Sequence, residues 1–170
     1  MSKVEFYQQI SQQVSAIIGD EADIIANMAN LSAILFDALE DVNWVGFYRV
    51  VDKVKSKQQE LVLGPFQGKV ACIRIPLGVG VCGTAAEHAK TQRIADVHQF
   101  SGHIACDATS NAEIVLPIKL HDKVIAVLDI DSRCVDRFDE QDQQGLEMIV
   151  QIFEHQLLQS QLLQSETSKH

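Results

Sequence analysis

Apolar residues recur at helical spacing near the start of the chain, and this pattern predicts two helices. Ser2 and Glu5 have the spacing of a capping box, which marks the beginning of a helix. The Gly19-Asp20 pair predicts the break between the two helices. The inward positions are Phe6, Ile10, Val14 and Ile17 in the first helix and Ile24, Met28, Leu31 and Leu35 in the second.

The middle of the chain has short apolar runs with period-two alternation, which predict strands. The first strand is expected over 43–50, and the charged stretch "VDKVKSKQQE" after it is expected to be a solvent-exposed hairpin connection. Shorter strands are predicted in "LVLGPF", broken by Gly64-Pro65, in "VACIRIPL" and in "QRIADV", with a short helix in "GTAAEHAK". The two strongest strands, "EIVLPIKL" and "KVIAVLDID", are joined by His121-Asp122, which predicts a tight turn.

A long helix is predicted to close the domain. Asp139 is its expected cap, and its inward residues are Leu146, Ile149, Val150, Phe153 and Leu157. Two helices, a run of strands and a final helix indicate a single α+β domain over 1–160, with an antiparallel sheet and helices packed on its faces. The segment 161–170 is expected to be a polar tail that frays or serves an interface.

Composition narrows the class of partner. The net charge of −9 and the pI of about 5.0 argue against nucleic acid or an anionic membrane as the main partner. The first residues lack the apolar run of a signal peptide, and no apolar stretch is long enough to span a membrane. We therefore expect a cytoplasmic protein, where paired cysteines are more often catalytic, redox-active or metal-bound than structural.

One of the four cysteines, Cys106, lies among loop-forming residues in "SGHIACDATSNAEI". A cysteine used only for packing prefers an apolar interior, so this position predicts a reactive thiol. Cys72 and Cys82 are remote in sequence but could converge on it if their loops cap one sheet. We expect no metal, because no Cys-x-x-Cys is present and His103 with Cys106 supplies at most two ligands. Cys134 is given no role.

The run "GVGVCG" at 78–83 formally matches a dinucleotide-binding fingerprint. Pro76 in the preceding strand and the lack of a second crossover unit argue against that function. A glycine-rich turn with unusual backbone angles is the favoured interpretation.

Alternation along "KVIAVLDID" predicts a shared face for two carboxylates. It places Ile125, Val127, Asp129 and Asp131 on one face and Val124, Ala126, Leu128 and Ile130 on the other. Glu113 opens the preceding strand, so a hairpin could bring it near this pair. The alternative is a strand end emerging into solvent. Three acids around an apolar hollow would raise at least one pKa, which would allow proton donation near neutral pH.

The stretch "NWVGFY" places Trp44, Gly46 and Tyr48 on one face of the first strand, with the glycine leaving a gap between two aromatic rings. It could be a core strand with a packing glycine. It could also form a trough for a small ligand with an ammonium or a soft sulfur group.

From Asn43 to Gly145 the chain resembles the free methionine-(R)-sulfoxide reductases, which are small single-domain GAF proteins. The motifs that carry the resemblance are "NWVGFY", "LVLGPFQGKVACIRIPLGVGVCGTA", "DVHQFSGHIACDATSNAEIVLPI" and "VLDIDS". It implies a six-stranded antiparallel sheet flanked by N- and C-terminal helices. It also implies reduction of free methionine-(R)-sulfoxide with thioredoxin as the reductant, without a metal or organic cofactor, in a homodimer.

The resemblance also implies roles for single residues. Cys106 matches the catalytic cysteine, Cys72 the usual resolving cysteine, and Cys82 a third cysteine with a supporting or alternative resolving role. The residues implied around the substrate are the acids Glu113, Asp129 and Asp131 and the aromatic wall of Trp44 and Tyr48. Which acid donates the proton stays open. The competing hypothesis is a non-catalytic GAF sensor that binds a cyclic nucleotide or another small ligand.

Overall fold

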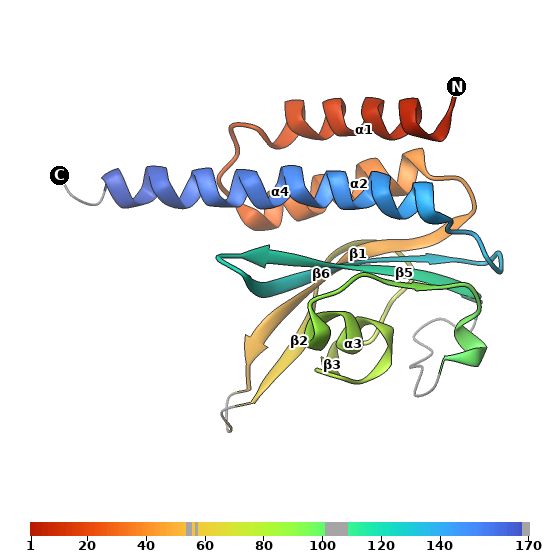
Figure 1. Ribbon diagram of the computed structural model, residues 1–170. Coiled ribbons are helices and arrows are strands. Elements are labelled where there is room, and N and C mark those ends of the chain that lie inside the picture. The colour runs from red at the N-terminus through yellow and green to blue at the C-terminus, as the bar shows by residue number, and fades with distance from the viewer. Residues whose placement is uncertain (54–55, 57, 101–108, 168–170) are drawn as a thin grey trace.

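Helices form layers on one side of a central sheet, and a single short helix covers the other side (Figure 1). The computed structural model describes residues 1–53, 56, 58–100 and 109–167. The helices are α1 (Lys3–Ile18), α2 (Ile24–Ala38), α3 (Gly80–His88) and α4 (Glu140–Thr167), with a 3₁₀ turn at Val97–Gln99. The strands are β1 (Val42–Asp52), β2 (Gln59–Gly68), β3 (Arg74–Pro76), β4 (Gln92–Ile94), β5 (Ala112–Leu120) and β6 (Lys123–Ser132).

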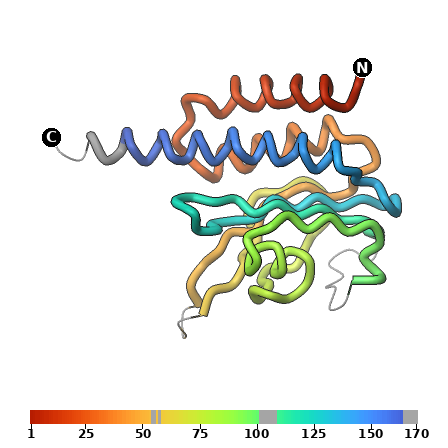
Figure 2. Tube along the Cα trace, viewed as in Figure 1, coloured from red at the N-terminus to blue at the C-terminus, as the bar shows by residue number. Residues whose placement is uncertain are grey.

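The sheet has six strands in the order β3-β2-β1-β6-β5-β4, and every neighbouring pair is antiparallel. This confirms the predicted fold class. Helices α2 and α4 pack on the sheet and α1 packs on both of them, while α3 contacts β5 and β6 from the opposite side. The tube in Figure 2 shows the same layers, with the N-terminal end of the chain on the side of α1 and α4.

Two apolar clusters therefore lie on the two faces of the sheet. The larger one joins the helices to the sheet and contains Val45, Phe47, Leu128 and Ile130. The smaller one lies under α3 and contains Trp44, Tyr48, Val127 and Cys82. Neighbouring residues of the same strand thus serve different clusters, as strand alternation requires.

The predicted helix signals are confirmed at both ends of the chain. Ser2 and Glu5 form a capping box, and Asp139 accepts the main-chain N–H groups of Gln141 and Asp142 at 2.9 Å. The expected inward positions of α2 and α4 are buried or partly buried. Helix α4 continues to Thr167, into the segment expected to be a polar tail. Among the described residues, no helix is both long and apolar enough to cross a membrane.

One inward position of α1 was wrong. Ile17 is 42% exposed, whereas Ile18 is fully buried. Both residues are compatible with the helical period counted from Val14, since one lies three residues on and the other four. Ile18 is the residue that packs into the larger apolar cluster, between the helices and the sheet.

Two bulges alter the predicted strands. Strand β2 is not broken at Gly64-Pro65: Gly46 pairs with Phe66 and Tyr48 with Leu63, so β2 absorbs an extra residue and continues. In β6, Ala126 pairs with Ile118 and Val124 with Lys119. The extra residue, Ile125, therefore packs on the helix side and Val124 on the side of α3, opposite to their predicted faces.

Two turns behave as their residues predict. His121 and Asp122 have φ values of 50° and 63°, which is the conformation of a tight hairpin turn. Gly78 and Gly80 have φ values of 76° and 65°, so "GVGVCG" forms a turn with unusual backbone angles that leads into α3. The segment "VACIRIPL" is strand only from Arg74 to Pro76, and its first residues form the β2–β3 connection.

Candidate active site

The pairing of three strands brings the predicted acids together beneath α3. In one row across β1, β6 and β5, Trp44 pairs with Asp131, and Asp131 pairs with Glu113. In the next row, Gly46 pairs with Asp129. Cross-strand partners on one face lie within about 5.5 Å of each other, so these side chains form one patch.

Cys82 comes from α3 and meets this patch from above. Its Sγ–H donates to Glu113 Oε1 at 4.0 Å. Single ligand atoms of Cys82, Glu113 and Asp129 all lie within 4.8 Å of one another, and the three residues are 4%, 6% and 6% exposed. Among the described residues, Asp129 Oδ1 is buried without a hydrogen-bond partner. The resulting site has a thiol and two carboxyl groups shielded from water, with Asp131 partly exposed beside them.

Burial raises the pKa of all three groups. Burial, with the nearby Asp129 and Asp131 charges, raises the pKa of Glu113 well above its ordinary value. Burial also raises the pKa of Asp129 to about 6, although hydrogen bonds with Cys82 and Glu113 oppose this. The pKa of the Cys82 thiol is raised by burial and by the same two carboxylates. Burial therefore favours the protonated form of Glu113, and a raised pKa for at least one of the acids is what the sequence predicts.

Aromatic rings form the wall beside the acids. The Trp44 ring stacks on Tyr48 at a centroid distance of 5.9 Å and on Phe66 at 5.3 Å. The space over Gly46 is not an open gap, because a Cβ there would lie 2.5 Å from Trp44 Cη2 and 2.4 Å from Phe66 Cβ. The missing side chain instead lets the Trp44 ring lie along its own strand.

Phe66 was not predicted as part of this wall. It comes from β2 and lies opposite Gly46 in the β1–β2 pairing. The signal that could have found it is the hairpin register, but the bulge at Gly64-Pro65 hides that register from a simple count along the sequence.

The same aromatic residues hold the connection that carries Cys72. Trp44 Nε1 donates to the Lys69 carbonyl at 3.0 Å, and the Tyr48 hydroxyl donates to the Cys72 carbonyl at 3.1 Å. Cys72 itself is partly exposed and disulfide-bonded, whereas Cys82 and Cys134 are free. The predicted wall and the predicted resolving cysteine are thus one connected unit.

The predicted nucleophile, Cys106, lies outside the described residues. The chain is described again from Thr109, and the next residues are tied to the site strands. Asn43 Nδ2 donates to Ser110 Oγ at 3.0 Å, and the Asn111 N–H donates to the Ser132 carbonyl at 2.7 Å. Residues 110 and 111 therefore lie beside the ends of β1 and β6, close to Asp131.

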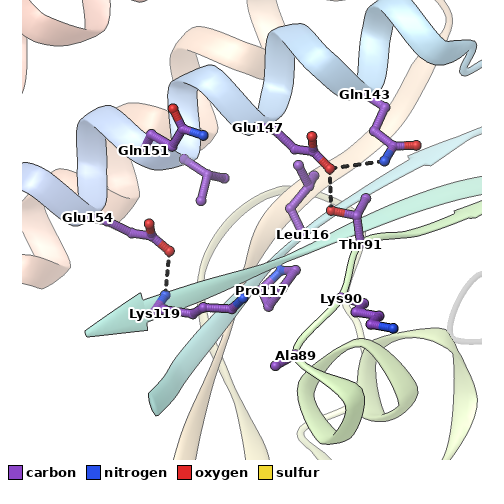
Figure 3. Close-up of a pocket in the computed structure, with 11 residues that line it drawn as sticks. Ala89, Lys90, Thr91, Leu116, Pro117, Lys119, Gln143, Glu147, Gln151 and Glu154 are labelled. Carbon is purple, nitrogen blue, oxygen red and sulfur yellow. Dashed lines mark hydrogen bonds between the residues drawn. The ribbon is translucent and has the colours of Figure 1, made fainter. Parts of the chain in front are cut away.

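A groove of about 470 Å³ lies elsewhere, between α4, β5 and the α3–β4 connection (Figure 3). None of the predicted site residues lines it. β4 pairs with β5 only as far as Val115, and beyond it Glu154 accepts the Lys119 main-chain N–H at 2.6 Å and Pro117 has no N–H, so this part of β5 resists the addition of a further strand. Glu147 is bonded to Thr91 and Gln143 within the groove. The residues that line the groove do not bring a thiol and carboxyl groups together, as the cluster of Cys82, Glu113 and Asp129 does.

The fold and the site together define a GAF domain: the family model "GAF domain" matches residues 26–154. A more particular likeness follows from individual proteins. The chain is 51% identical over 150 residues to the free methionine-R-sulfoxide reductase of Escherichia coli (strain K12), which covers 88% of this chain and 87% of that protein. The chain belongs to the family of free methionine-R-sulfoxide reductases.

Solved structures agree with this membership. The structure of fRMsr of Staphylococcus aureus in complex with substrate is 52% identical, has a TM-score of 0.82, and covers 89% of this chain and 95% of its own. The free methionine-R-sulfoxide reductase from Neisseria meningitidis in complex with its substrate is 40% identical, with a TM-score of 0.87. That match covers 96% of this chain and 95% of the other.

Proposed function

We propose that this chain reduces free methionine-(R)-sulfoxide to methionine. The observation that carries the proposal is the buried group of Cys82, Glu113 and Asp129 beside the stacked Trp44 ring. Burying carboxyl groups costs free energy, so such a cluster is expected where it has chemical work to do. Family membership supports the same activity.

The site suits a small zwitterion with a soft sulfur group. The carboxyl groups of Asp129 and Asp131 offer partners for the ammonium, and Asp129 Oδ1, which is buried without a hydrogen-bond partner among the described residues, can accept one of its N–H groups. The Trp44 and Tyr48 rings offer an apolar surface for the sulfur and its methyl group.

In the proposed reaction, the Cys106 thiolate attacks the sulfoxide sulfur while a carboxyl group protonates the sulfoxide oxygen. Glu113, whose pKa is raised well above its ordinary value by burial and neighbouring charges, is the proposed donor. The oxygen passes to Cys106, methionine leaves, and Cys106 becomes a sulfenic acid. The Cys72 thiol then attacks the sulfenic sulfur, water leaves, and a disulfide forms. No metal or organic cofactor is required in this scheme.

Cys72 has the properties expected of a resolving cysteine. It is disulfide-bonded and partly exposed, on a connection fixed by Tyr48. Cys82 is free and buried, which favours a supporting role beside the carboxyl groups over resolution of the sulfenic acid. Thioredoxin is the proposed reductant of the disulfide, and the cytoplasm, which keeps thiols reduced, is the proposed location.

A homodimer is also proposed. Several apolar side chains are exposed on the helices at the ends of the chain: Val4 and Ile17 on α1, and Met148, Leu162 and Leu163 on α4. Burial of such a surface between two copies would stabilise the pair. Light scattering at micromolar concentration that gave the monomer mass would refute the dimer.

The reductase activity is tested by giving the protein each sulfoxide epimer of free methionine with dithiothreitol and measuring the methionine formed. We expect turnover of the R epimer only, and none by Cys106→Ser. The alternative of a cyclic-nucleotide sensor is disfavoured, because buried carboxyl groups repel a phosphate anion. No turnover of either epimer, with calorimetric binding of a cyclic nucleotide, would establish the sensor instead.

A further inference from the structure

Two exposed apolar side chains flank the disulfide-bonded Cys72 on the β2–β3 connection. We infer that Val70 and Ile73 form the docking surface for a protein dithiol that reduces this disulfide. The inference rests on the proposed function, because only a catalytic disulfide has to be reduced in every turnover.

The exposure of these two side chains is unusual. Val70 is 87% exposed and Ile73 is 70% exposed. Val70 has the highest exposed fraction of any large apolar side chain in the described part of the chain. Single exposed apolar residues are ordinary, but here two of them lie within two residues of a disulfide-bonded cysteine.

The connection is held in place, so the two side chains are presented on a fixed support. Trp44 Nε1 and the Tyr48 hydroxyl bond the carbonyls of Lys69 and Cys72. The Leu63 main-chain N–H donates to the Ile73 carbonyl at 2.9 Å. A surface that is ordered before binding loses less entropy when a partner covers it.

The chemistry identifies the kind of partner. A thiolate of the reductant attacks one sulfur of the disulfide, the S–S bond breaks, and a mixed disulfide forms. The second thiol of the reductant then attacks the reductant's own sulfur in the mixed disulfide and releases the enzyme's cysteine. The enzyme thus gains two electrons and two protons, and the two thiols of the reductant become a disulfide. Cys72 is partly exposed, so a partner that attacks its sulfur would approach over the β2–β3 connection. It must therefore be a protein whose reactive cysteine is surrounded by apolar residues that can cover Val70 and Ile73.

The test uses the variants Val70→Ser and Ile73→Ser, alone and combined. Turnover of free methionine-(R)-sulfoxide is measured against the concentration of reduced thioredoxin, and separately with dithiothreitol. We expect the double variant to raise the KM for thioredoxin about five- to tenfold, as loss of interface anchors does. Turnover with dithiothreitol and the KM for the sulfoxide should stay at wild-type values, because the small dithiol needs no docking surface.

Val135→Ser is the matched control, because Val135 is also exposed, at 58%, but lies after β6 and away from Cys72 in sequence. An unchanged KM for thioredoxin in the double variant would overturn the inference, as would an equal rise in Val135→Ser. An equal loss of turnover with dithiothreitol would also overturn the inference, since Val70 and Ile73 would then be needed for the fold. A change in the molar mass of the double variant in light scattering would overturn it as well, since the two residues would then belong to a dimer interface. A failure of the proposed function would be distinguished from this, because the wild-type protein would then form no methionine even with dithiothreitol.

Discussion

Gly46→Ala should damage stability and catalysis together, because Gly46 lies under the aromatic wall. The added Cβ would lie 2.4 Å from Phe66 Cβ and 2.5 Å from Trp44 Cη2. Carbon atoms in contact normally lie about 3.5–4.0 Å apart, so the rings must move by about 1 Å. That shift would strain the 3.0 Å hydrogen bond from Trp44 Nε1 to the Lys69 carbonyl.

The size of both effects can be estimated. Overpacking a well-packed core costs about 1–3 kcal/mol. For a domain of this size, that loss lowers the melting temperature by roughly 2–12 °C. A misplacement of about 1 Å at reacting groups can cost about a hundredfold in rate, so kcat/KM for the free sulfoxide should fall at least tenfold.

Gly145→Ala separates the two effects. A Cβ on Gly145 would lie 2.1 Å from Tyr7 Cγ, in the helical layer on the other side of the sheet. It should therefore lower the melting temperature by a similar amount and leave the kinetics unchanged. The assay is thermal unfolding by circular dichroism together with initial rates with dithiothreitol. Wild-type kinetics in Gly46→Ala, or an equal kinetic loss in Gly145→Ala, would refute the reasoning.

Three further predictions concern the acids and the cysteines. Because burial raises the pKa of Asp129 from 3.8 to about 6, its contribution to stability is complete below pH 3.8 and is lost as the pH rises through 6. Asp129→Asn should flatten the decline in unfolding free energy between pH 4 and 7, and an unchanged slope would contradict this. Without reductant, Cys72→Ser should release up to one methionine per chain, and Cys106→Ser should release none. A methionine assay measures the release, and mass spectrometry detects the sulfenic acid left on Cys106. The N-acetylated amide of the sulfoxide should be reduced at least tenfold less efficiently than the free amino acid, because Asp129 and Asp131 lose their charged partner; comparable kcat/KM values would exclude a closed site.

Local patterns account for much of the fold that could be predicted. The helix caps at Ser2 and Asp139 depend on side chains within three residues of the groups they bond. Period-two alternation identified the main strands in the same way. It failed at Gly64-Pro65 and at Ile125, because a bulge depends on how two strands pair and not on either strand alone.

The site shows the same division. Alternation within β6 predicted that Asp129 and Asp131 share a face, and the short hairpin predicted Glu113 beside them. Contacts across distant elements had no such signal. Phe66 reaches the wall through a pairing that the bulge shifts, and Cys82 meets Glu113 only because α3 folds over the sheet.

Packing of the helices against one face of the sheet offsets the free-energy cost of burying carboxyl groups on the other face. Asp129 lies between Leu128 and Ile130, which are fully buried against the helices on the opposite face. Because these neighbours are packed on the helix side, strand alternation directs the Asp129 side chain to the face under α3. Protonation lowers the free-energy cost of that position but does not remove it, since the pKa of Asp129 is about 6 and the group still ionises at neutral pH. The sheet therefore uses one face to hold the fold and the other to bury the carboxyl pair of Glu113 and Asp129.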